Sequence, residues 1–148
     1  MSTRPPTIIL ADLHLSRGTP HEVGRDLARM LERHPGARVI VAGDLFDLAT
    51  DTPAQSRQEA VGDVLGAHPE IRAALGSHLD GGGQLWLAPG NHDPDLGSEP
   101  LVRALLDAIG PSREARSRVR RTPWFFRVGG LHVEHGHVYE PDNAPEHP

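Results

Sequence analysis

The chain has 148 residues, a formal net charge of −5 and no cysteine. This length suits a single domain, and the lack of cysteine excludes disulfides, iron–sulfur clusters and thiolate zinc sites. The negative charge provides no general attraction for nucleic acid or an anionic membrane. Any metal site must therefore use nitrogen and oxygen ligands, which suit Mn, Fe, Zn or Mg.

No targeting or membrane signal is visible in the sequence. No apolar run reaches the roughly 18–20 residues that a membrane-spanning helix needs, and Met1–Pro6 lacks the charged and apolar regions of a secretion signal. We therefore expect a cytoplasmic protein without a membrane span.

The first predicted elements are a strand and a helix. Thr7–Ala11 predicts a strand covered on both faces, because its apolar residues do not alternate with polar ones. A helix follows, with Thr19 as its N-cap and Glu22 reaching back to the cap amide, and residues 34–36 end it. Its apolar stripe consists of Val23, Leu27, Met30 and Leu31.

The middle of the chain repeats this alternation. Arg38–Ala42 predicts a second buried strand, and Gln84–Ala88 predicts a third. Between them, a start signal at Thr52 predicts one helix, and a second helix restarts near Pro69. Three glycines at 81–83 then break the chain.

The last third predicts one more helix, over residues 101–109, and then a β-rich tail. In this tail Trp124–Val128 and Leu131–Glu134 flank Gly129-Gly130, which predicts a two-residue hairpin turn. Alternating strands and helices predict an α/β domain with layered elements and right-handed crossovers.

Polar side chains follow each predicted strand directly. Ligands of open α/β sheets bind outside the carboxyl ends of the strands, so we expect the four sets to meet at one edge of the sheet. They contain no Lys or Arg, and a bound cation would relieve the resulting repulsion. The sets are Asp12-Leu13-His14, Gly43-Asp44-Leu45-Phe46-Asp47, Gly90-Asn91-His92-Asp93 and His135-Gly136-His137.

The residue types and spacing fit a pair of metal ions. Asp12 and His14 project to the same side of an extended segment and can chelate one ion. The two oxygens of Asp44 can bridge two metals roughly 3.5–4 Å apart. Asn91 offers an oxygen, and His135 a nitrogen, to the second ion.

These four motifs, in this order, resemble the calcineurin-like metallophosphoesterase family from Ile8 to about Asn143. The resemblance implies a layered β-sheet sandwich flanked by helices (αββα). It also implies a dinuclear site that hydrolyses a phosphomonoester, phosphodiester or nucleotide-diphosphate substrate with a metal-bridged hydroxide. Its two divalent ions would be bound by Asp12 and His14, by Asp44 as the bridge, and by Asn91 and His135.

The resemblance assigns two further roles. His92 would protonate the leaving alkoxide, and Asp93 is a candidate for orienting the His92 ring. Asp47 remains open between a turn-forming role and support of the site.

The family pattern continues to a further Gly-His-x-His motif that residues 1–148 do not contain. We interpret His135-Gly136-His137 as the earlier His-Gly-His motif of the family, although it could be the terminal pair, which leaves open whether His137 is a ligand. We therefore expect one domain over residues 1–148 that is incomplete at its C-terminus and binds its second metal poorly. The alternative is an inactive fold that binds one metal weakly or none.

A rival function is nucleic-acid binding by the arginines between Arg113 and Arg127 beside Trp124. We disfavour it, because every basic residue in the chain is Arg and the Trp-Phe-Phe stretch fits a core position better. We expect His132 to pack within its strand. The other histidines outside the motifs are expected at the surface; they are His21, His34, His68, His78 and His147.

Overall fold

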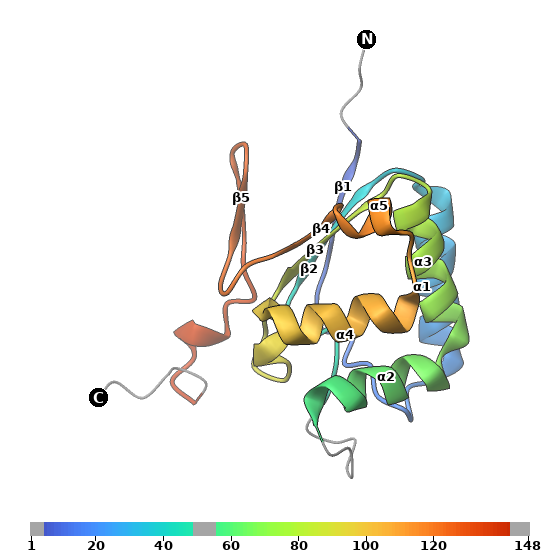
Figure 1. Ribbon diagram of the computed structural model, residues 1–148. Helices are drawn as coiled ribbons and strands as arrows, with labels where there is room; N and C mark the ends of the chain where they lie inside the picture. The colour runs from blue at the N-terminus through green and yellow to red at the C-terminus, as the bar shows by residue number, and fades with distance from the viewer. Residues whose placement is uncertain (1–4, 49–55, 143–148) are drawn as a thin grey trace.

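The computed structural model of this chain describes residues 5–48 and 56–142 and shows a mixed α/β fold (Figure 1). Within these ranges, four parallel strands lie side by side in the order of the sequence. They are β1 (Thr7–Leu10), β2 (Arg38–Ala42), β3 (Gln84–Ala88) and β4 (Val119–Arg121). The predicted α/β class with a parallel sheet is therefore confirmed.

The helices lie on one side of this sheet in Figure 1. Because each strand is followed in space by the next strand in sequence, crossovers of the same hand bring their helices to the same face. The helices are α1 (His21–Arg33), α2 (Arg57–Ala67), α3 (Pro69–Asp80), α4 (Glu99–Ile109) and α5 (Arg113–Arg116), with 3-10 turns η1 (Pro94–Gly97) and η2 (His137–Tyr139).

The side chains of β2 and β3 alternate between two apolar layers. Val39 and Val41 pack into the large core beneath the helices, together with Leu85. Ile40 and Trp86 point to the opposite face and belong to a second, smaller cluster. This alternation follows from the two-residue period of a strand.

A β-hairpin covers the opposite face. β5 (Phe126–Val128) pairs antiparallel with β6 (Leu131–Val133), and Gly129 supplies the positive φ of the turn between them. The Phe126 ring lies 5.1 Å from the ring of Trp86, centroid to centroid. The hairpin prediction is confirmed, but β6 belongs to this second sheet and not to the parallel one.

The edge strand β1 is less covered than the sequence predicts. Ile8 and Leu10 pack against the core beneath the helices, but Ile9 is 45% exposed on the other face. Among the described residues, the smaller cluster includes side chains of β2 and β3 and none of β1. The prediction of burial on both faces is thus wrong for β1.

Strand β4 is an element that the sequence did not predict, because two of its three residues are arginines. Its backbone pairs with β3, with Trp86 opposite Arg120. The Arg120 guanidinium lies 4.9 Å from the Trp86 ring centroid, and that of Arg38 lies 4.4 Å from it. These cation–π contacts explain how charged residues can occupy the sheet beside an indole.

The N-cap predicted for the first helix is not formed in the structure. Thr19 does not cap α1: its Oγ1 accepts the Ser16 N–H at 2.8 Å, and Pro20 occupies the cap position without a side-chain bond. Glu22 pairs with Arg25 and does not reach back to the cap.

The helix start predicted at Thr52 lies outside the described residues. In the structure the Ser56 hydroxyl caps α2, and α3 begins at Pro69 as predicted.

Several predicted surface positions are wrong. His68 and His78 are buried, because their Nε2 atoms bond the carbonyls of Ser16 and Ala37 across the fold. In contrast, Trp124, which was expected in the core, is exposed, and His132 is exposed although its ring stacks on that of Phe125 at 4.8 Å. His147 lies outside the described residues.

Within the described ranges, each helix is too short or too polar to cross a membrane.

Candidate metal centre

The loops that follow β1 and β2 are held together by backbone hydrogen bonds. The His14 N–H donates to the Asp44 carbonyl at 3.0 Å, and the Leu15 N–H donates to the Leu45 carbonyl at 2.9 Å. Leu15 and Phe46 form an isolated parallel bridge, and both are fully buried. The backbone pairing of β1 with β2 therefore continues beyond the ends of the strands. The buried side chains of Leu15 and Phe46 fix the position of the loops that carry the polar residues.

Three of the predicted ligands have an unusual backbone. Asp12, His14 and Asp44 have φ values of 57°, 46° and 52°, in the left-handed region that disfavours most side chains. No other described residue except glycine has a positive φ. Such strain persists where the surrounding structure enforces it, and it is concentrated at functional sites.

Two glycines allow the loops to approach each other. A Cβ atom at Gly90 would collide with the carboxylate of Asp44 and lie 2.6 Å from its backbone nitrogen. A Cβ at Gly43 would lie 2.6 Å from the ring of His135. Larger residues here would therefore separate the side chains that the loops bring together.

Asp93 holds the two loops together from inside the protein. It is fully buried, and its carboxylate accepts the N–H groups of Asp44, Phe46 and Gly90 at 2.9–3.1 Å. Burial raises the pKa of Asp93 although these three hydrogen bonds lower it. Its role is to fix the backbone around Asp44.

The expectation that Asp93 orients the His92 ring is therefore wrong. The Oδ1 atom of Asp47 lies 3.4 Å from Nδ1 of His92, which makes Asp47 the carboxylate beside this ring. Asp47, which the sequence left open between two roles, is thus in contact with a residue of the candidate site. The backbone N–H of His92 donates to Asp44 Oδ1 at 2.9 Å.

The polar residues line one open hollow of about 370 Å³ at the carboxyl ends of the strands. It contains all five predicted metal ligands together with His92. Among the described residues, those lining the hollow include no Lys or Arg. The lining residues are Asp12, His14, Asp44, Asn91, His92, His135, Gly136, His137 and Glu140.

His135 presents a nitrogen lone pair to this hollow. Its Nδ1 lies 2.8 Å from the Ala42 carbonyl, which can only accept, so the ring proton is on Nδ1. In the neutral ring, Nε2 then faces Asp44 Oδ2 at 3.2 Å and Asn91 Oδ1 at 3.1 Å. Three acceptor atoms converge there, which requires either a proton on Nε2 or a cation between them.

Asp44 is shared by two groups of possible ligands. One group is Asp12, Asp44 and His135, and the other is His14, Asp44 and His92; the ligand atoms of each group lie within 4.8 Å of one another. His14 Nε2 lies 3.7 Å from Asp12 Oδ1 and 3.6 Å from Asp44 Oδ2. Oxygen and imidazole donors at these distances fit hard or borderline divalent cations.

The structure adds two residues to the predicted set. His137 and Glu140 line the same hollow, and the His137 ring lies 5.2 Å from that of His135, centroid to centroid. Burial, followed by repulsion from His135, lowers the pKa of His137. The His-Gly-His spacing left His137 open as a ligand. Glu140 reaches the hollow through the turn η2, which the sequence did not predict.

The arginines of the rival nucleic-acid surface are largely engaged within the fold. Arg116 pairs with Asp107 at 2.8 Å, and Arg118 pairs with Glu114 at 2.8 Å. Arg121 donates to the Gly97 carbonyl at 3.1 Å, and Arg120 lies over Trp86. These contacts give the cluster a structural role.

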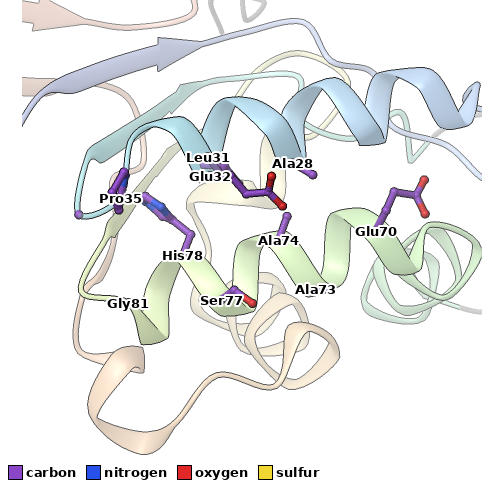
Figure 2. A pocket seen from close by; sticks show the side chains of 11 residues that line it. Ala28, Leu31, Glu32, Pro35, Glu70, Ala73, Ala74, Ser77, His78 and Gly81 are labelled. Atoms are coloured by element: carbon purple, nitrogen blue, oxygen red, sulfur yellow. The ribbon is translucent and has the colours of Figure 1, made fainter.

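A second hollow of about 390 Å³ lies between α1 and α3 (Figure 2). Its lining is mostly apolar or small, with Ala28, Leu31, Ala73 and Ala74 among the lining residues. It contains none of the residues at the strand ends, so its larger volume does not make it the better candidate for catalysis.

The chain was compared with models of known protein families and with solved structures, and neither comparison found a match.

Proposed function

We propose that this chain is a metal-dependent phosphoester hydrolase of the calcineurin-like metallophosphoesterase type. The observation that carries the proposal is Asp44, a buried carboxylate shared by two groups of ligand atoms in a hollow lined by carboxylates and imidazoles. The helices, parallel sheet and hairpin would then correspond to the first three layers of an αββα arrangement.

The donor set fits two divalent ions with Asp44 between them. The two ligand groups share Asp44 but can be divided between the ions in more than one way. In the division that the family resemblance implies, Asp12 and His14, 3.7 Å apart, would hold the first ion, and Asn91 and His135, 3.1 Å apart, the second, with His137 and Glu140 available as additional donors. Bound there, such ions lower the pKa of water and stabilise charge on a phosphoryl group.

Charge explains how an acidic chain could bind a phosphorylated substrate. The carboxylates of Asp12, Asp44 and Glu140 contribute about −3 against +4 from two divalent ions, so the loaded site carries about +1 before a hydroxide is counted and is close to neutral with it. The ions therefore remove the negative charge that would otherwise repel an anionic phosphomonoester, phosphodiester or nucleotide diphosphate from the hollow. The openness of the hollow suits a substrate whose leaving group extends into solvent.

His92 is suited to supply a proton to the leaving oxygen. It lines the hollow, and the Asp47 carboxylate lies 3.4 Å from its Nδ1, where it can hold the ring in position. His92 also belongs to one of the possible ligand groups. His92→Gln distinguishes the two roles. If His92 is the proton donor, the variant loses turnover but still binds the metal, whereas if His92 is a ligand, the variant loses the metal.

The direct test is hydrolysis of 4-nitrophenyl phosphate by the purified chain with Mn²⁺. We expect turnover that a chelator abolishes and that Asp44→Asn reduces more than about 100-fold, since even outer-shell changes at metal sites cost 10–100-fold. Asp26→Asn, an exposed aspartate of α1, is the matched control and should keep full activity.

The alternative is a metallophosphoesterase-like fold without activity. A folded chain that binds Mn²⁺ but hydrolyses neither aryl phosphates nor aryl phosphodiesters would favour that alternative. Metal-independent turnover, or full activity in Asp44→Asn, would contradict the proposed function.

A further inference from the structure

A second cluster of metal-type ligands lies outside the strand-end hollow. His21 is the first residue of α1, His68 lies between α2 and α3, and Glu70 is in the first turn of α3. Glu70 Oε1 lies 2.9 Å from His21 Nδ1 and 3.5 Å from His68 Nδ1. The three ligand atoms are all within 4.8 Å of one another.

The buried member of this cluster has an unpaired nitrogen aimed at the carboxylate. His68 is 1% exposed, and its Nε2 lies 2.8 Å from the Ser16 carbonyl, which can only accept. The proton of the neutral ring is therefore on Nε2, and Nδ1 carries a lone pair. Among the described residues Nδ1 has no hydrogen-bond partner. A buried nitrogen lone pair facing a carboxylate at 3.5 Å is unfavourable unless a proton or a metal cation lies between them.

The packing of α1 brings the carboxylate to this position. Gly24 lies in the interior of α1, where a glycine disfavours a helix relative to alanine. A Cβ at Gly24 would lie 2.6 Å from Oε1 of Glu70 and 2.9 Å from Cγ1 of Ile71. Figure 2 shows Glu70 at one end of the groove between α1 and α3. The glycine therefore accommodates the carboxylate beside the start of α1.

We propose that His21 Nδ1, His68 Nδ1 and Glu70 Oε1 bind one divalent transition-metal ion of the Zn²⁺ class. Two imidazoles and one carboxylate are a common zinc donor set, and tetrahedral Zn²⁺ places its ligand atoms about 3.4 Å apart. The two distances to Glu70 Oε1, 2.9 and 3.5 Å, bracket this spacing. The His21 side chain is 61% exposed, so solvent can reach the fourth position.

The contact between His68 and Ser16 gives the site a structural consequence. A ligating histidine that donates its other N–H to a carbonyl is held in a fixed orientation. Here that carbonyl belongs to Ser16, in the loop that also carries His14. The ion would fasten the start of α1, the junction of α2 and α3, and this loop. The inference does not depend on phosphoester hydrolysis.

The experiment uses the full chain with Asp44→Asn, which removes the carboxylate that both ligand groups of the strand-end hollow share. Zn²⁺ alone is titrated calorimetrically into this variant and into the same variant carrying His21→Gln or Glu70→Gln. We expect one Zn²⁺ per chain in Asp44→Asn, with affinity reduced more than about 100-fold by either second substitution. His34→Gln, an exposed histidine at the end of α1, is the matched control and should leave the affinity unchanged.

Two additional readouts keep the test independent of folding defects. Circular dichroism checks that each variant is folded, and Zn²⁺ should raise the midpoint of thermal unfolding only where His21 and Glu70 are both present. Absence of Zn²⁺ binding by Asp44→Asn overturns the proposal, because the cluster is then a hydrogen-bonded group that binds no metal. Unchanged affinity in either double variant overturns it as well.

Discussion

The carboxyl ends of β1 and β2 differ from the face of the sheet beneath the helices. The strand ends carry Asp12, His14 and Asp44, which are the three described residues other than glycine with a positive φ. The face beneath the helices carries most of the fully buried apolar side chains. At the strand ends, imidazole nitrogens lie 3.1–3.7 Å from side-chain oxygens, and the carboxylates of Asp12 and Asp44 are both close to His14. Beneath the helices, ordinary strand and helix geometry buries Leu and Val residues. The strand ends therefore combine backbone strain with electrostatic repulsion, whereas apolar burial stabilises the fold elsewhere.

The largest effect on stability should come from inserting a methyl group where the loops after β2 and β3 are in close contact. Gly90→Ala places a methyl group against the carboxylate and backbone nitrogen of Asp44. Overpacking of this kind costs about 1–3 kcal/mol of unfolding free energy. Urea denaturation measures it. Gly62→Ala in α2, where a Cβ meets no atom within 4 Å, should instead stabilise the chain by up to about 1 kcal/mol. Equal effects would contradict the contrast between the regions.

The backbone strain can be isolated by a pair of substitutions at Asp12. Glycine and alanine both remove the carboxylate, but φ is 57° here, so Asp12→Gly should be about 1 kcal/mol more stable than Asp12→Ala. At Asp107, inside α4, the order should reverse by a similar amount. Urea unfolding in the presence of a chelator measures both pairs. The same sign at both sites would show that the Asp12 backbone is unstrained.

The smallest effect concerns a buried histidine beneath the helices. Burial lowers the pKa of His78 from 6.5, despite hydrogen bonds with the backbone of Ala37 and Gln84 that raise it. Below about pH 6.5 the unfolded chain then binds more protons than the folded chain, so the unfolding free energy falls as the pH drops. The contribution of one such group stays below about 1.4 kcal/mol per pH unit.

Unfolding free energies at pH 7.5 and 5.5 test this point. His78→Gln should flatten the decline, and the exposed His34→Gln should leave it unchanged. A decline that is identical in the wild type and His78→Gln would mean that this group is not the source.

Much of the fold was predictable because the buried strands have unmistakable patterns. The bounds of β2 and β3 match their predictions, since consecutive β-branched and apolar residues identify strands covered on both faces. The parallel arrangement then brought Asp12, Asp44 and Asn91 to one edge despite their separation in sequence. His135 also reaches this hollow, by way of the hairpin.

Other features depend on tertiary partners that local sequence does not specify. β4 is identified only by pairing with β3 and by the indole beneath its arginine. The burial of His68 depends on the Ser16 carbonyl, 52 positions away. Likewise, the separate tasks of Asp47 and Asp93 follow from which loop atoms each carboxylate meets.

The central claim is that Asp44 is shared by two metal ions at the strand ends. Electron paramagnetic resonance during titration with Mn²⁺ tests it most directly, because two ions that share a bridging carboxylate give an exchange-coupled spectrum. We predict this spectrum for the wild-type chain at Mn²⁺ concentrations high enough to fill the weaker second site, and its loss in Asp44→Asn. Only uncoupled single-ion signals, or a coupled spectrum that persists in Asp44→Asn, would contradict the claim.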